Sequence, residues 1–370
     1  MAKNPKPIII SGSDSELQAR IGGKRYYRRQ KIRRVLRIVS RCALVVAALA
    51  AGFLVTETLL GISETPLTEG VAVPPAATTT QPLTTARPLP EGPPLHTFYV
   101  PLELMDNREQ ARELMDQAAA LKANAAVMLF KDSGGYLSYK SDLMQQRLLN
   151  ASQRTRWRTD WTLYDLKNRS KQKIIAVIHC FNDSLAAGLM PDGAVLLRNT
   201  EQAAWKDAQG KAWLNPYAES AQEYLLAVMR EVVAFGADEI LLCGVQFPTG
   251  DLQAAVFPGE EPDANEDRLA ASRNQALLDF LAKAKAVTGE KTLYCMIPFH
   301  LARNGGEEYG GTLWSGAADV FAIDMRGAHW TQDDDFWKTQ PVMPVVDSIE
   351  NTNGARDYII LEDEALQARF

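Results

Sequence analysis

The sequence predicts an α/β protein whose main domain is a (β/α)8 barrel. Eight short apolar runs lie between residues 97 and 362, and helical patterns separate several of them. Strands that alternate with helices form a parallel sheet, and this stretch is close to the roughly 250 residues typical of such a barrel. An open doubly wound sheet is the alternative fold, but no glycine-rich phosphate loop follows the first apolar run.

The eight runs are expected to be buried strands because they are short, apolar and bounded by polar or turn residues. They span residues 97–102, 125–130, 173–181, 239–245, 292–299, 319–325, 341–346 and 357–362. Apolar residues at helical spacing predict helices over 107–124, 220–236 and 267–289, of which the last two close on a glycine. The last two strand–helix units are short.

The N-terminal part of the chain differs from this domain in charge. Residues 1–41 contain twelve Lys or Arg and two acids, a net charge of +10, so the remainder carries −15 of the total −5. Residues 42–62 are apolar and reach the length of about 20 residues that a membrane-spanning helix needs. The positive-inside rule makes residues 1–41 cytoplasmic and the rest extracellular, as in a single-pass protein of the cell membrane. A cleaved signal peptide is the alternative.

A spacer separates the membrane anchor from the barrel. Residues 63–95 are rich in Pro and Thr and contain too few apolar residues to fold, so an extended linker is expected. The barrel domain is therefore assigned to residues 96–370. The basic segment is expected to contact anionic membrane lipid rather than nucleic acid, because it adjoins the membrane span.

The four cysteines indicate neither disulfides nor a metal site. Cys42 lies in the membrane span, and Cys180, Cys243 and Cys295 each lie in an apolar run. No CxxC or HExxH spacing is present, so small buried thiols are expected, with no metal and no other cofactor.

Polar residues at the strand exits are the candidate site, because the active site of a (β/α)8 barrel lies at the C-terminal ends of its strands. Two opposed carboxyl groups would suit glycoside hydrolysis, and the candidate catalytic acids are Asp183, Asp324 and Asp347. The alternative role for each acid is helix capping or solvation. The candidate substrate-binding residues are Lys131, Asp132, His179, Gln246, His300, Arg326 and Trp213.

Three stretches resemble a known family. "ANAAVMLFKDSGGYLSYKSD" (123–142), "AVIHCFND" (176–183) and "AWLNPYAESAQEYLLAVMREVVAFGADEILLCGVQFP" (212–248) are similar to the glycoside-hydrolase-like barrel domain of bacterial secreted and membrane-anchored proteins. The resemblance extends over roughly residues 97–330, and it implies a barrel fold and a role with glycans.

The resemblance fails at the strand exit that matters most for catalysis. Where the family has Asp-Tyr-x-Arg, this chain has Cys243, Gly244, Val245 and Gln246, and the family's Lys in the second motif is Asn182. A thiol with an ordinary pKa of about 8.5 does not replace a carboxyl group in acid–base catalysis.

The sequence therefore predicts a degenerate glycoside-hydrolase-like domain, a pseudoenzyme that binds cell-wall or extracellular glycan. Two alternatives remain. One is an active glycosidase that uses Asp183 with Asp324 or Asp347. The other is a non-catalytic surface scaffold for protein partners.

Overall fold

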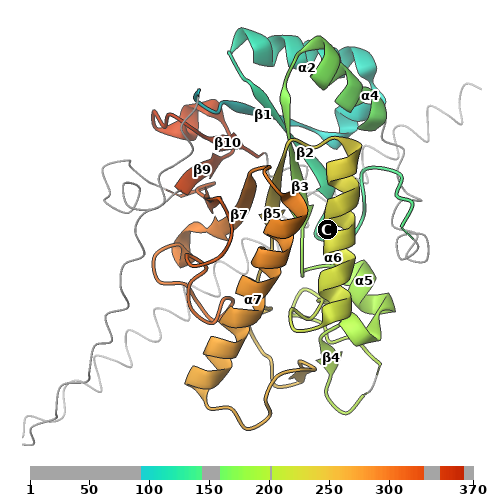
Figure 1. Cartoon of the computed structure of the whole chain (residues 1–370), viewed down its shortest axis with the longest axis vertical. Coiled ribbons are helices and arrows are strands. Elements are labelled where there is room, and N and C mark those ends of the chain that lie inside the picture. Colours follow the sequence, from blue (N-terminus) through green and yellow to red (C-terminus); the bar gives the residue numbers. More distant parts are fainter. Residues whose placement is uncertain (1–92, 144–158, 201, 329–341, 362–370) are drawn as a thin grey trace, which may run out of the picture. The chain divides into compact units, whose positions relative to one another are not determined.

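The computed structural model describes residues 93–143, 159–200, 202–328 and 342–361 (Figure 1). The chain divides into two units, Met1–Thr80 and Gln81–Phe370, and all the described residues belong to the second. The expected membrane span over 42–62 lies outside the described residues, as do the basic segment and most of the spacer. Within the described ranges, no helix has both the length and the apolar character needed to cross a membrane.

Eight parallel strands form a nearly closed barrel, which confirms the predicted fold of the domain. Each strand overlaps one of the expected apolar runs, and the neighbours in the sheet follow the order in the chain. The strands are β1 (Thr97–Val100), β2 (Ala125–Lys131), β3 (Lys173–His179), β5 (Glu239–Cys243), β7 (Leu293–Pro298), β8 (Val320–Asp324), β9 (Val342–Val346) and β10 (Ile359–Ile360).

The barrel closes where β10 meets β1. His96 forms an isolated parallel bridge with Tyr358, and the two rings stack with their centroids 5.1 Å apart. The Tyr358 backbone N–H donates to the Leu95 carbonyl at 3.0 Å, and the Ile360 N–H donates to the Thr97 hydroxyl at 2.6 Å. This seam is held by a few bonds rather than a full ladder, so the barrel is nearly rather than fully closed.

Helices cover the outside of the first part of the barrel. They are α2 (Arg108–Ala120), α4 (Thr159–Tyr164), α5 (Ser184–Leu189), α6 (Glu219–Phe235) and α7 (Glu266–Thr288). The helices α6 and α7 run side by side (Figure 1), and Lys283 Nζ donates to Gln222 Oε1 at 2.7 Å between them. As its glycine predicted, α6 ends at Gly236, which has a left-handed φ of 112°.

The unit after β9 is short, as the sequence predicted, because only the 3-10 helix η5 (Ile349–Thr352) lies between β9 and β10. The connection from β7 to β8 also lacks an α-helix, which was not predicted: residues 299–319 contain only the 3-10 helix η4 (Phe299–Leu301). The Trp314 ring packs edge-to-face on Phe321 of β8, with centroids 4.7 Å apart. Loop side chains therefore take the place of a covering helix on this side.

A second, two-stranded sheet was not predicted. The strands β4 (Leu196–Leu197) and β6 (Ala255–Val256) pair antiparallel. They belong to the loops that follow β3 and β5, so they lie at the C-terminal ends of the barrel strands, near the start of α6 (Figure 1). Strands of two residues are too short for a detectable sequence pattern.

Candidate functional site

Four side chains line the barrel interior at the C-terminal ends of its strands. Residues paired across parallel strands share one face of the sheet, and His179 pairs with Cys243. Met296 Sδ lies 3.8 Å from Cys243 Sγ. The Met296 position pairs with residue 322 of β8, two residues before Asp324, so Asp324 faces the same way. His179, Cys243, Met296 and Asp324 are called the mouth layer below.

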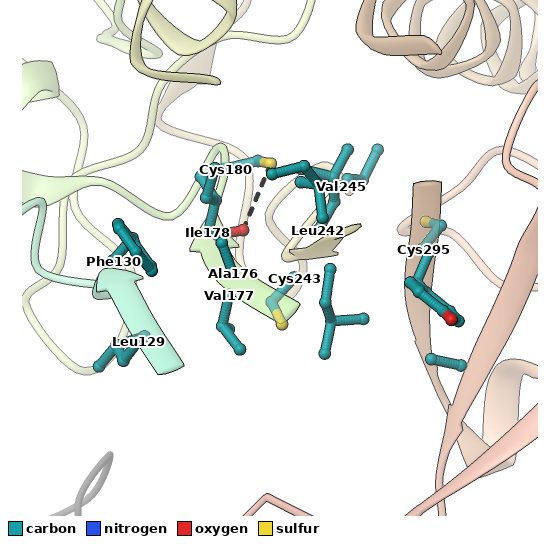
Figure 2. Close-up of a cluster of buried hydrophobic side chains, with 14 of the residues drawn as sticks. Leu129, Phe130, Ala176, Val177, Ile178, Cys180, Leu242, Cys243, Val245 and Cys295 are labelled. Carbon is teal, nitrogen blue, oxygen red and sulfur yellow. Dashed lines mark hydrogen bonds between the residues drawn. The ribbon is translucent and has the colours of Figure 1, made fainter. Parts of the chain in front are cut away.

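Cys243 faces the barrel interior, as the sequence predicted. Figure 2 shows its sulfur on the opposite side of the sheet from the sulfurs of Cys180 and Cys295. The residue has 0% exposed surface, and burial raises the pKa of its thiol well above the ordinary range. At neutral pH the position therefore carries a protonated thiol, which neither attacks a sugar nor donates a proton to one.

His179 is neutral. Neither ring nitrogen contacts solvent or has a hydrogen bond of ordinary geometry within the described part of the chain. Burial lowers the imidazole pKa to about 3, and the positive charges of Lys131 and Arg326 add to this shift, which a weak interaction with Asn182 opposes. The mouth layer therefore contains an uncharged imidazole.

Asp324 is paired with a neighbour on the same strand exit. Its two carboxylate oxygens accept hydrogen bonds from Arg326 Nε at 2.8 Å and Nη2 at 2.7 Å. Arg326 also donates to the Leu361 carbonyl at 3.4 Å. The carboxylate charge is thus balanced by a guanidinium group in bidentate geometry.

Asp183 is a structural residue in this conformation. Its Oδ1 accepts from the Ala186 N–H at 2.8 Å, which caps α5, and its Oδ2 accepts from Tyr224 at 3.1 Å and lies 2.8 Å from Lys131 Nζ. Lys131 and Asp183 both have 0% side-chain exposure. The capping alternative considered for the acids therefore describes Asp183, and neither residue reaches a surface that a substrate could touch.

A register shift between Leu129 and Lys131 explains where Lys131 points. Leu129 pairs with Val177, but Lys131 pairs with Ile178, so β2 contains one extra residue. Such a bulge turns the following side chain to the other face of the sheet. Lys131 consequently lies on the helix-facing side, where it also donates to the His179 carbonyl at 2.8 Å.

Asp132 organises the tight turn after β2. Its Oδ1 accepts from the backbone N–H groups of Gly134 and Tyr136, each at 2.9 Å, and burial raises the pKa of its carboxyl group. In the same turn, a Cβ on Gly135 would lie 2.1 Å from Asp183 Oδ1. Glycine at this position allows the turn to pack directly on the buried carboxylate.

The remaining candidate residues are spread over the domain. Trp213 is half-buried and its indole Nε1 donates to Asp207 Oδ2 at 2.9 Å. Gln246 is half-buried, and His300 is exposed in η4. Asp347 accepts from Asn351 Nδ2 at 2.5 Å and lines a small pocket of about 230 Å³ near the barrel seam.

The structure does not bring the three candidate catalytic acids together. In the eight-stranded order, β9 lies four strands from β3, so Asp347 and Asp183 lie on opposite sides of the ring. Asp183 is also buried and lies outside the mouth layer. Asp324 is the one member of the mouth layer with a carboxylate. Within the described ranges, no group of three or more His, Cys, Asp or Glu side chains could hold a metal ion.

The sequence did not reveal a larger pocket beside the β4–β6 sheet. It has a volume of about 870 Å³ and is formed by the loops after β3 and β5. We call it the loop pocket, and its lining includes Leu197, Trp205, Lys206, Asp207, Gln209, Thr249, Asp251 and Ala254. These residues come from separate loops with no shared motif, and the clustered tryptophans at 205 and 213 were the one available signal.

Comparison with solved structures finds a glycoside hydrolase domain with a similar fold. The glycoside hydrolase domain of PgaB (BpsB) from Bordetella bronchiseptica superposes with a TM-score of 0.53 at 12% identity, covering 74% of this chain and 95% of that chain. A hypothetical protein from Ruminiclostridium thermocellum ATCC 27405 gives a TM-score of 0.46 at 24% identity, covering 54% and 96%. No curated protein matches.

At such identities the PgaB likeness concerns the fold alone. A family comparison goes further, because the family described as "Putative glycosyl hydrolase domain" matches residues 97–295, more than half of the chain. That stretch contains the strands from β1 to β6, the first half of β7 and both loops of the loop pocket. The chain belongs to the putative glycosyl hydrolase domain family.

Proposed function

We propose that this domain binds carbohydrate and does not perform ordinary acid–base hydrolysis of glycosides. The observation that carries the proposal is the buried thiol of Cys243 in the mouth layer. It lies at the strand exit where the family resemblance implies an aspartate. Glycoside hydrolysis by the common mechanisms needs two carboxyl groups that flank the scissile bond. Loss of a central catalytic group usually lowers the rate by several powers of ten.

The other acids near the strand exits support the same conclusion. The carboxylate oxygens of Asp183 already cap a helix and form a buried ion pair, and Asp324 forms an ion pair with Arg326. A glycosidase that used Asp183 with Asp324 would first have to release Asp183 from all of these contacts.

The proposal also includes the location of the domain outside the cell. The anchor over 42–62 and the spacer over 63–95 would hold the domain outside the cell, where cell-wall or extracellular glycan is the available carbohydrate. Residues 1–41 would remain in the cytoplasm against anionic lipid. Protease digestion of intact cells tests this: the barrel domain should be cleaved while residues 1–41 stay protected.

Hydrolysis and binding can be tested on the full chain. In a screen of bacterial polysaccharides we expect no release of reducing ends, and on a glycan array we expect binding. Turnover by the wild type that disappears in Asp324→Asn would overturn the non-hydrolytic proposal. Asp183→Asn is the weaker choice, because that substitution also disrupts the α5 cap and the ion pair with Lys131.

A scaffold for protein partners is the second candidate, and the closed mouth layer favours it. Cys243 and both ring nitrogens of His179 are shielded from solvent, which leaves little room for a ligand at the barrel axis. Absence of glycan binding on the array, combined with capture of a protein partner, would favour this candidate over carbohydrate binding.

A further inference from the structure

We infer that the loop pocket is a binding site for an uncharged oligosaccharide. The inference rests on the proposed glycan binding, but it places the ligand beside the β4–β6 sheet rather than at the mouth layer. Four properties of the pocket carry it: its position, its rigidity, the chemistry of its lining and its charge.

The pocket lies on the face of the barrel where binding sites are found. Its two walls are the loops after β3 and β5, which leave the C-terminal ends of neighbouring strands. The volume of about 870 Å³ falls within the usual range for small-molecule sites, roughly 300–1,000 Å³. The pocket is therefore well placed for a ligand and large enough for one.

The two walls are fastened to each other. Arg198 connects them three times, because its backbone N–H donates to the Ala254 carbonyl at 2.7 Å, its Nε to the Gln253 carbonyl at 2.8 Å and its Nη2 to the Ala255 carbonyl at 3.4 Å. The pairing of β4 with β6 adds a further link. A ligand that enters this pocket does not have to order the loops first, which reduces the entropic cost of binding.

The floor of the pocket is also fixed. Trp205 is 5% exposed, and its backbone N–H donates to the Val195 carbonyl at 2.8 Å. Asp207 accepts three hydrogen bonds, from the backbone N–H groups of Gln209 and Lys211 and from Trp213 Nε1, each at 2.9 Å. These contacts hold the backbone at Trp205 in place and fix the orientation of the Asp207 carboxylate.

The lining has apolar and polar groups that complement the C–H faces and the hydroxyl groups of a sugar ring. Leu197 and Ala254 are apolar and exposed, and they suit the C–H faces of a pyranose. Gln209, Thr249 and Asp251 are exposed and provide an amide, a hydroxyl and a carboxylate for sugar hydroxyl groups. Apolar walls with a few fixed polar groups are typical of specific small-ligand sites.

The charge of the pocket lining indicates which class of saccharide the pocket binds. The lining contains two acids, Asp207 and Asp251, and one base, Lys206. A uronic acid or another anionic sugar would meet like charge, which disfavours binding. Uncharged sugars therefore fit the pocket better than acidic ones.

The test uses the full chain and a printed array of neutral and acidic bacterial oligosaccharides, followed by titration calorimetry with the strongest ligand. Ala254→Arg places a long side chain in the pocket, and we expect it to weaken binding at least tenfold. Gln209→Ala changes an exposed side chain and should weaken binding several-fold without affecting folding. Ala119→Arg, at an exposed position on α2, is the matched control and should bind like the wild type.

The outcomes distinguish failure of this inference from failure of the proposed function. Glycan binding that is unchanged in both Ala254→Arg and Gln209→Ala overturns the loop pocket as the site and leaves carbohydrate binding intact. Stronger binding to acidic than to neutral oligosaccharides overturns the assignment to uncharged sugars. A wild-type chain that binds no oligosaccharide on the array overturns both the inference and the proposed function.

Discussion

Lys131 Nζ lies 2.8 Å from Asp183 Oδ2, and neither side chain has any exposed surface. This contact joins the exits of β2 and β3 and fixes the start of α5. Two charges removed from water cost several kcal/mol each, and their mutual attraction offsets this cost only while both are present. The pair therefore makes folding sensitive to the loss of either partner.

Lys131→Met is expected to lower the free energy of unfolding by about 3–5 kcal/mol, because it leaves the Asp183 carboxylate buried without its cation. Urea denaturation measures this change. The double variant Lys131→Met/Asp183→Asn should lose less than the sum of the two single variants. Arg169→Met, which breaks an exposed pair with Asp116, is the control and should cost only about 0–1 kcal/mol. Equal losses of unfolding free energy in Lys131→Met and Arg169→Met would contradict the importance of the buried pair.

Gly244→Ala should destabilise the domain more than Gly210→Ala. Both glycines have positive φ, 64° and 77°, so both substitutions carry the backbone penalty of about 1–2 kcal/mol. A Cβ on Gly244 would also lie 2.7 Å from Asn182 Oδ1, whereas nothing lies within 4 Å of a Cβ on Gly210. Thermal unfolding compares the two variants. Equal shifts in Tm would show that the Asn182 side chain moves aside without a loss of stability.

The stability of the domain should fall as the pH is lowered from about 6.5 toward 3, in part because of His179. The unfolded imidazole has an ordinary pKa of about 6.5, and burial lowers the folded pKa to about 3. Between these values the unfolded state binds the proton more strongly, so acid favours unfolding, by up to about 1.4 kcal/mol per pH unit. In His179→Gln, urea denaturation at pH 7 and pH 5 should show a smaller difference. An unchanged difference would mean that His179 is not the buried neutral group.

The three described cysteines should not react in the native protein. Cys180, Cys243 and Cys295 are buried free thiols, and burial raises the pKa of each. In a Cys42→Ser background, a thiol reagent should label none of them in the native state and all three in guanidinium chloride. Mass spectrometry of the peptides identifies the sites. Native labelling of Cys243 would show that the barrel mouth opens to solvent.

The fold of the barrel could be predicted because its strands are buried on both faces. Such strands are continuous apolar runs, and all eight were recognisable, including the two-residue β10 within 357–362. The long helices were recognisable from their apolar spacing and terminal glycines. The six-residue α5 was not predicted, since its main signal is the cap at Asp183, which the sequence equally allows to be a catalytic acid.

The candidate site was less predictable, because it depends on which way each side chain points. The register of β3 and β5 places Cys243 on the interior face, in agreement with the sequence. The side chain of Lys131 instead points to the helix-facing side of the sheet because β2 contains an extra residue, and nothing in the local sequence indicates that shift in register. The loop pocket depends on the pairing of two loops some 55 residues apart, such as Arg198 with Gln253, which no single motif encodes.

The bond from the Leu95 N–H to Asp357 Oδ1 joins positions 262 residues apart, and it belongs to the seam between β1 and β10. During synthesis, β1 emerges from the ribosome early and β10 late, so β1 remains an unpaired sheet edge for most of translation. Unpaired edges attract other strands, and contacts between distant parts of a chain form slowly. The free edge of β1 is therefore expected to be prone to aggregation until residues 357–361 have left the exit tunnel.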